Sequence, residues 1–169
     1  MKKLIAMMLV LALAVSMAAC GGKSAAKEPL VGTMEENVMK IMEISPVEFM
    51  GGAIGVDLSD VDAVKYFTGL SSADKITDVS VYESMTGSQA FSLILARVAD
   101  AKDAETVAQE MNDNIDTRKW ICVGADQKVA AGYSDTVMLI MLDSQLGLKT
   151  QSFVDAFQQV CGGDLDFTI

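Results

Sequence analysis

Histidine is absent from this 169-residue sequence. The chain therefore lacks the most common general base, the most common metal ligand and the only side chain that titrates near pH 6.5 without perturbation. Few enzymes work without histidine, so its absence weighs against most familiar hydrolytic and metal-dependent active sites. The sequence favours a protein that acts without a catalytic site, a metal or a cofactor.

Basic residues and cysteines are also scarce. The chain has 13 Lys and Arg residues against 23 Asp and Glu residues, a formal net charge of −10. An acidic surface is repelled by nucleic acid phosphates and by anionic lipid headgroups, so a nucleic acid partner is excluded. Beyond Cys20, only Cys122 and Cys161 remain. They could form one disulfide outside the cytoplasm, but each lies in an apolar run, which favours two small buried thiols.

The N-terminus has the order of a secretory signal. Lys2 and Lys3 precede an unbroken apolar run, Leu4 to Val15. Such a run after a positive start is typical of a leader peptide. Its twelve residues are fewer than the roughly 20 that a membrane-spanning helix needs. We therefore expect a cleaved leader and not a permanent transmembrane helix.

The leader ends in Met17-Ala18-Ala19-Cys20, which resembles the lipobox of bacterial lipoproteins, although Leu usually stands where this chain has Met17. The resemblance implies removal of residues 1–19 and a diacylglycerol thioether on Cys20. Cleavage after Ala18, as in an ordinary signal peptide, is the alternative. Several acyl chains on one residue hold a protein stably in a bilayer. We expect a lipid-anchored protein on the outer face of the cytoplasmic membrane.

Residues 20–29 contain mostly small side chains and are expected to form a flexible tether. Residues 30–169 are long enough for one globular domain with one core. Apolar residues at helical spacing predict four helices, over about 34–45, 60–69, 104–115 and 153–161. Thr33 and Glu36 have the spacing of a capping box, Asp103 is the expected cap of the third helix, and Gly162 is the expected end of the fourth.

Strand patterns follow the second helix and the third. Residues 76–81 alternate apolar and polar side chains. "AFSLILARV" is apolar on nearly both faces and is expected to be a central strand, and "TVMLIML" is again apolar throughout. Residues 128–132 form a fourth candidate. "FMGGAIG" is interpreted as a glycine-rich connection, and Trp120 to Val123 as a short apolar stretch turned inward. The order predicts an α+β domain, with an antiparallel or mixed sheet of about four to five strands and helices packed on one face.

Three segments, "SQAFSLILARVAD", "MNDNIDTRKWICVGAD" and "VMLIML", resemble a family of bacterial lipoproteins of unknown function, DUF4358, found mainly in Firmicutes. Members combine a lipobox, a tether, an early helix and a C-terminal helix. The resemblance spans about residues 30–163. It implies a Gram-positive origin, placement outside the cytoplasmic membrane and no established reaction.

Two segments are candidate interaction sites. Arg118, Lys119 and Trp120 form a basic and aromatic cluster in an acidic chain, which suits an anionic partner or a glycan. Alternatively, Trp120 packs in the core and the two charges lie at the C-terminal end of the preceding helix. The second segment, Thr86, Gly87, Ser88 and Gln89, joins two expected strands. It is either an exposed functional loop or a plain hairpin turn.

These observations favour a non-catalytic binding or interaction module whose partner is a cell-surface protein or a small ligand. The alternative is a small cell-envelope enzyme that uses carboxylate and hydroxyl groups. Such an enzyme needs two carboxylates that converge in one cleft and have shifted pKa values.

Overall fold

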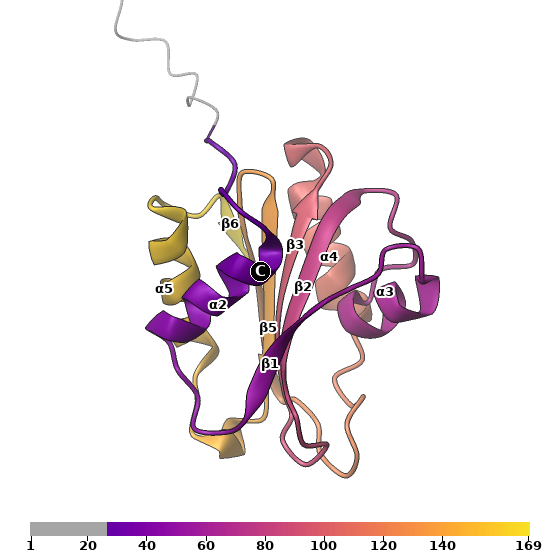
Figure 1. Ribbon diagram of the computed structural model, residues 1–169, viewed down its shortest axis with the longest axis vertical. Helices are drawn as coiled ribbons and strands as arrows, with labels where there is room; N and C mark the ends of the chain where they lie inside the picture. Colours follow the sequence, from indigo (N-terminus) through magenta and orange to yellow (C-terminus); the bar gives the residue numbers. More distant parts are fainter. Residues whose placement is uncertain (1–26) are drawn as a thin grey trace, which may run out of the picture.

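The computed structural model describes residues 27–169, which form an α+β domain (Figure 1). The predicted leader, Cys20 and most of the predicted tether lie outside the described residues. The helices are α2 (Met34–Ile44), α3 (Val61–Thr68), α4 (Ala104–Asn114) and α5 (Thr150–Cys161). The strands are β1 (Gly51–Gly55), β2 (Ile76–Ser84), β3 (Phe91–Val98), β4 (Gln127–Tyr133), β5 (Thr136–Leu142) and β6 (Phe167–Thr168). Two short 3-10 helices, η1 (Ala101–Asp103) and η2 (Ser144–Leu146), precede α4 and α5.

All neighbouring strands of the sheet are antiparallel, and their order is β1-β2-β3-β5-β4-β6. Strand β3 is central, as the sequence predicts, and its neighbour β5, which is also apolar on both faces, is central too. The α+β class is confirmed, and the sheet has six strands. No helix within residues 27–169 is long and apolar enough to cross a bilayer.

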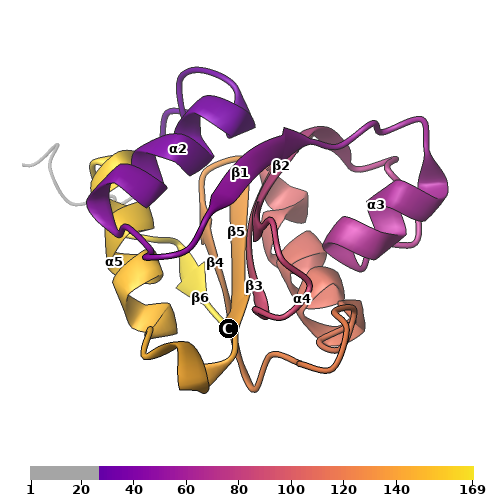
Figure 2. The ribbon, with the colours of Figure 1, turned by 60° about the horizontal axis from the view of Figure 1, so that its bottom comes forward.

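Helices cover both faces of the sheet, so the prediction of one covered face is wrong. Helices α2 and α5 pack on one face, and α3 and α4 pack on the other (Figure 2). The reason lies in the central strands. Along β3, Leu93 and Leu95 point to the α2/α5 face, whereas Ile94 and Ala96 point to the α4 face. A strand that is apolar on both sides needs cover on both sides.

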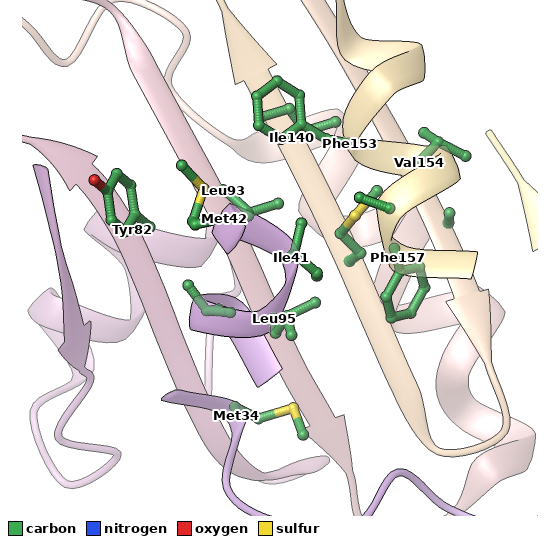
Figure 3. Close-up of a cluster of buried hydrophobic side chains, with 14 of the residues drawn as sticks. Met34, Ile41, Met42, Tyr82, Leu93, Leu95, Ile140, Phe153, Val154 and Phe157 are labelled. Carbon is green, nitrogen blue, oxygen red and sulfur yellow. The ribbon is translucent and has the colours of Figure 1, made fainter. Parts of the chain in front are cut away.

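The core on the α2/α5 face is built from long apolar side chains (Figure 3). Met34 and Ile41 from α2 and Phe157 from α5 are fully buried there, together with Leu93 and Ile140 from the sheet. Burying a side chain of this size contributes about 1.5–3 kcal/mol. The helical spacing that predicts α2 and α5 is therefore also the pattern that holds them on the sheet.

The expected helix ends are mostly confirmed. Thr33 Oγ1 accepts a hydrogen bond from Glu36 N, and Glu36 Oε2 accepts one from Thr33 N, which completes the capping box of α2. Gly162 ends α5 in the left-handed conformation. Asp103 stands at the N-cap position of α4, but its side chain makes no capping hydrogen bond.

Three segments differ from the expectation. The glycine-rich connection contains strand β1, in which Ala53 lies opposite Tyr82 of β2. A Cβ at Gly51 would lie 2.4 Å from Tyr82 Cε1, so glycine leaves room for that ring. The two-residue strand β6 is too short to give a sequence signal. Residues 120–123 form no strand, and Cys122 has a left-handed φ of 65°.

Candidate functional site

Four connections meet at one end of the sheet, which we call the loop end (Figure 1). They are residues 45–50 between α2 and β1, 85–90 between β2 and β3, 115–126 between α4 and β4, and 143–149 between β5 and α5. Both predicted interaction segments lie here. Residue 27, where the described chain begins, lies at the opposite end.

The segment Thr86 to Gln89 is a turn ordered by its own side chains. Gln89 Oε1 accepts hydrogen bonds from Ser84 Oγ at 2.7 Å and from Thr86 Oγ1 at 3.0 Å. Thr86, Gly87 and Ser88 are exposed, and Gln89 is half-buried. A Cβ at Gly87 would meet Ile121 only at ordinary contact distance, 3.7 Å, so space does not require a glycine.

The segment Arg118 to Trp120 divides into outward and inward side chains. Arg118 is exposed, and its backbone N–H donates to Asp116 Oδ1 at 2.8 Å. The Lys119 side chain is only 1% exposed, and its Nζ lies 2.6 Å from Glu83 Oε1. Trp120 is partly buried, and its indole Nε1 is buried without a hydrogen-bond partner. Lys119 is therefore neither a surface contact for an anionic partner nor a free charge at the end of α4. It is one half of a buried ion pair.

Aromatic rings surround the Lys119 ammonium. Its Nζ lies 4.9 Å from the centre of the Tyr66 ring, 5.4 Å from Phe67 and 5.5 Å from Trp120. Burial lowers the pKa of Lys119, and Glu83 and Asp116 partly oppose this shift. Burial also raises the pKa of Tyr66, and the negative charges of Glu83 and Asp116 raise it further by smaller amounts.

Glu83 joins the Lys119 cluster to the sheet. Ser92 Oγ is buried and donates to Glu83 Oε1 at 2.8 Å, so the carboxylate bridges strand β3 and the α4–β4 connection. No substrate can reach the enclosed ammonium without rearrangement. Sequence reasoning missed Glu83. Glu83 lies two residues after Val81 and therefore on the same face of β2, the face that α3 and α4 cover. A carboxylate at such a position needs a buried partner, and this is the signal that the sequence offers.

Three large apolar side chains are exposed at the loop end. Met50, Met85 and Ile121 are 75%, 72% and 76% exposed. The Met85 N–H donates to the Met50 carbonyl at 2.9 Å, and Ile121 lies beside Gly87. We call these three residues the loop-end patch. Sequence analysis placed Ile121 inside, because "WICV" is apolar throughout, but the turn at Cys122 directs Ile121 outward.

A groove of about 660 Å³ also opens at the loop end. Its lining residues are Pro46, Glu48, Phe49, Gln89, Gln145, Leu146, Gly147 and Leu148. Gln89 is the one predicted interaction residue among them. Glu48 is the single carboxylate of this lining, so the pair of carboxylates expected for an envelope enzyme is not found in this groove.

The two cysteines of the described domain are unpaired. Cys122 is exposed, which corrects the expectation that both are buried, and Cys161 is half-buried. Burial raises the pKa of the Cys161 thiol to about 12. Within residues 27–169, no group of three His, Cys, Asp or Glu side chains is placed to hold a metal ion.

Comparison of this chain with protein-family models, with curated proteins and with solved structures yields no match.

Proposed function

We propose that this protein is an extracytoplasmic lipoprotein, anchored through a lipid on Cys20, whose domain is a non-catalytic binding module. Its partner is a second cell-surface protein that docks on the loop-end patch. The observation that carries the proposal is the grouping of Met50, Met85 and Ile121 at one end of the domain. Contiguous exposed apolar side chains are typical of protein interaction sites.

The position of residue 27 supports an anchored orientation. Lys27 Nζ lies 2.7 Å from Asp166 Oδ1 and 5.0 Å from the centre of the Tyr133 ring, and Ser134 Oγ donates to the Lys27 carbonyl. These contacts hold the start of the domain at the end opposite the loop-end patch (Figure 1). A lipid on Cys20, only seven residues before Lys27, would leave the patch at the end of the domain distant from the anchor.

The resemblance of Met17-Ala18-Ala19-Cys20 to a lipobox supports the same location. The envelope-enzyme alternative is the weaker one, because the groove at the loop end has a single carboxylate. The hollows lined by several carboxylates, such as Glu105, Glu110 and Asp113 on α4, are open helix surfaces and not clefts. A small ligand in the groove is the weaker binding hypothesis. Ligand sites are mostly enclosed and apolar, whereas this groove is open and has two glutamines in its lining.

Mass spectrometry of the protein purified from membranes tests the anchor. We expect a mature chain that begins at Cys20 and carries acyl chains, and release of the Cys20→Ser protein from the membrane fraction. A chain that begins at another residue, with an unmodified Cys20 thiol, would contradict the anchor.

Photo-crosslinking tests the docking surface in the intact cell envelope. A photoreactive residue at position 85 or 121 should form one defined adduct with another protein, whereas the same residue at Val31, which is 86% exposed, should not. Equal adducts at all three positions would contradict a specific surface.

A further inference from the structure

The outer side of strand β1 is an open sheet edge. The Met85 N–H donates to the Met50 carbonyl, and the Val56 N–H donates to the Val79 carbonyl. Hydrogen bonding alternates along an antiparallel pair, so the backbone groups of residues 50, 52, 54 and 56 face β2. The N–H and C=O groups of Gly51, Ala53 and Gly55 therefore point away from the sheet.

These six outward groups have no hydrogen-bond partner among residues 27–169. In Figure 1 strand β1 faces the reader, and no helix crosses in front of it. Natural edges are protected by charged side chains, by proline or by a cover. Residues 49–56, "FMGGAIGV", contain no charge and no proline, although the whole chain carries a net charge of −10.

We propose that β1 pairs antiparallel with β1 of a second copy of this chain, around a two-fold axis at Ala53. In this register Gly51 lies opposite the second copy's Gly55, and the two Ala53 residues lie opposite each other. All six outward groups of each copy then face a complementary group, and none is left over. A two-fold interface of this kind uses one surface twice.

The side chains of β1 are complementary in the same register. Ile54 is 48% exposed and would lie opposite the second copy's Gly52. A Cβ at Gly52 has nothing within 4 Å, so there is room for the isoleucine. Met50 would lie opposite the second copy's Val56, so the dimer covers Met50 and leaves Met85 and Ile121 of the loop-end patch exposed. Each exposed apolar side chain of the strand thus meets a glycine or another apolar residue.

Two copies of this acidic chain repel each other least where their surfaces carry no charge, and the β1 edge is such a surface. Glu48 and Asp57 flank the edge, and the register brings Glu48 of each copy close to Asp57 of the other. Their repulsion is screened by salt. We therefore expect the dimer to become tighter as the ionic strength rises, the reverse of an interface held by ion pairs.

The two-fold axis is also compatible with an anchor, an argument that rests on the proposed function. An axis perpendicular to the sheet turns the same face of both copies to one side. Lys27 lies over Tyr133, which packs on the α2/α5 face, so both tethers would leave from the same face of the extended sheet. The loop ends of the two copies would point in opposite directions, parallel to the membrane. One short strand pair buries less than the roughly 1,200 Å² of stable complexes, so the dimer is weak in solution and favoured by confinement to a membrane.

Sedimentation of residues 20–169, produced without the leader and therefore without lipid, tests the pairing independently of the anchor. We expect a concentration-dependent dimer that tightens at about 0.5 M NaCl. Ala53→Pro removes an outward N–H without removing a bond to β2, and should weaken the dimer at least about tenfold. Ile54→Lys should do the same if the proline variant does not fold. Val31→Lys is the matched control and should leave the dimer unchanged.

Disulfide trapping tests the register in membranes. In a Cys122→Ser background, Ala53→Cys should form a disulfide-linked dimer, because opposite residues of a hydrogen-bonded pair lie about 5.5 Å apart between Cα atoms. Val31→Cys is the exposed control and should form about tenfold less disulfide-linked dimer. A strict monomer in solution at every salt concentration, a dimer that Ala53→Pro leaves intact, or adducts of β1 only with a different protein would each overturn the proposal.

Discussion

Lys119 shows how a single residue can resemble a surface contact in sequence and be buried in the fold. Its ammonium has exchanged water for Glu83 and three aromatic rings. Removal of one partner of a buried ion pair leaves the other charge without compensation, which is costly. Replacement of both by apolar residues is often neutral.

Lys119→Met is therefore expected to lower the free energy of unfolding by about 3 kcal/mol. Denaturant unfolding measures the loss, and Lys119→Met combined with Glu83→Leu should recover much of it. Lys75→Met is the control, because the Lys75–Asp103 pair is largely exposed and should contribute less than about 1 kcal/mol. Equal losses for the two single variants would contradict the buried pair.

The two free thiols should differ in reactivity in the folded protein. The thiolate is the reactive form, and Cys161 has a pKa of about 12 because of burial, whereas Cys122 is exposed. At pH 8 an alkylating reagent should modify Cys122 first, and Cys161 only after denaturation. Peptide mass spectrometry of a time course measures both rates, and fast labelling of Cys161 in the native state would contradict the structure.

At the scale of elements, two helices end in the same way but in different surroundings. Gly69 ends α3 with φ 79°, and Gly162 ends α5 with φ 69°. A Cβ at Gly69 would lie 2.5 Å from Ile115 N, in the connection after α4, whereas a Cβ at Gly162 meets nothing within 4 Å. The close approach ties α3 to the end of α4.

Alanine should therefore be tolerated differently at the two caps. Gly162→Ala should cost about 1 kcal/mol of unfolding free energy, because only the left-handed backbone is strained. Gly69→Ala should cost about 3 kcal/mol or more, since backbone must also move. Thermal or denaturant unfolding of both variants gives the comparison, and similar losses would show that α3 is not held closely against Ile115.

A hydrogen bond between two connections gives a pH-dependent contribution. Asp126 accepts from Ser144 Oγ and from Ser144 N at 2.7 Å, and these bonds lower the pKa of Asp126 below its ordinary 3.8. The stabilisation is therefore complete above pH 3.8 and is lost as the pH falls through the lowered pKa. Ser144→Ala should move the Asp126 pKa upward in an NMR titration, and no change would contradict the contact.

The limits of sequence-based prediction follow the same elements. The helices and β2 have periodic apolar residues, and β3 and β5 are continuous apolar runs, which is why their positions are predictable. Strand β1 contains three glycines in five residues and lacks such a pattern, because its stability comes from pairing with β2 and from the Tyr82 ring. Pairing with a distant strand leaves no local signal.

At the scale of the molecule, the candidate site was predictable only in parts. The segments at 86–89 and 118–120 are separately identifiable, and the sheet brings them to one end. The two segments approach each other at Gly87 and Ile121, and this contact depends on the turn at Cys122. The exposure of Ile121 follows from that turn, and the burial of Lys119 follows from Glu83 on β2 and from the rings of α3, neither of which a periodic pattern in residues 118–123 indicates.

The loop-end patch should contribute to binding and not to folding. Met85→Asp changes an exposed side chain away from the core, so the free energy of unfolding should change by less than about 0.5 kcal/mol. The same variant should abolish the adduct of the photoreactive residue at Ile121. Met138→Asp, at a fully buried position, is the contrasting control and should prevent stable folding.

The far border of the sheet determines how far association can extend. Ala130 exchanges two hydrogen bonds with Ile169, and Asp166 N donates to the Gly132 carbonyl, so the chain's own final residues occupy much of the β4 edge. The edge strand on this side is therefore β6, whose two residues offer too few backbone groups for stable pairing with another strand. Backbone pairing through β1 would therefore stop at two copies, and an uncharged edge would not lead to a growing filament.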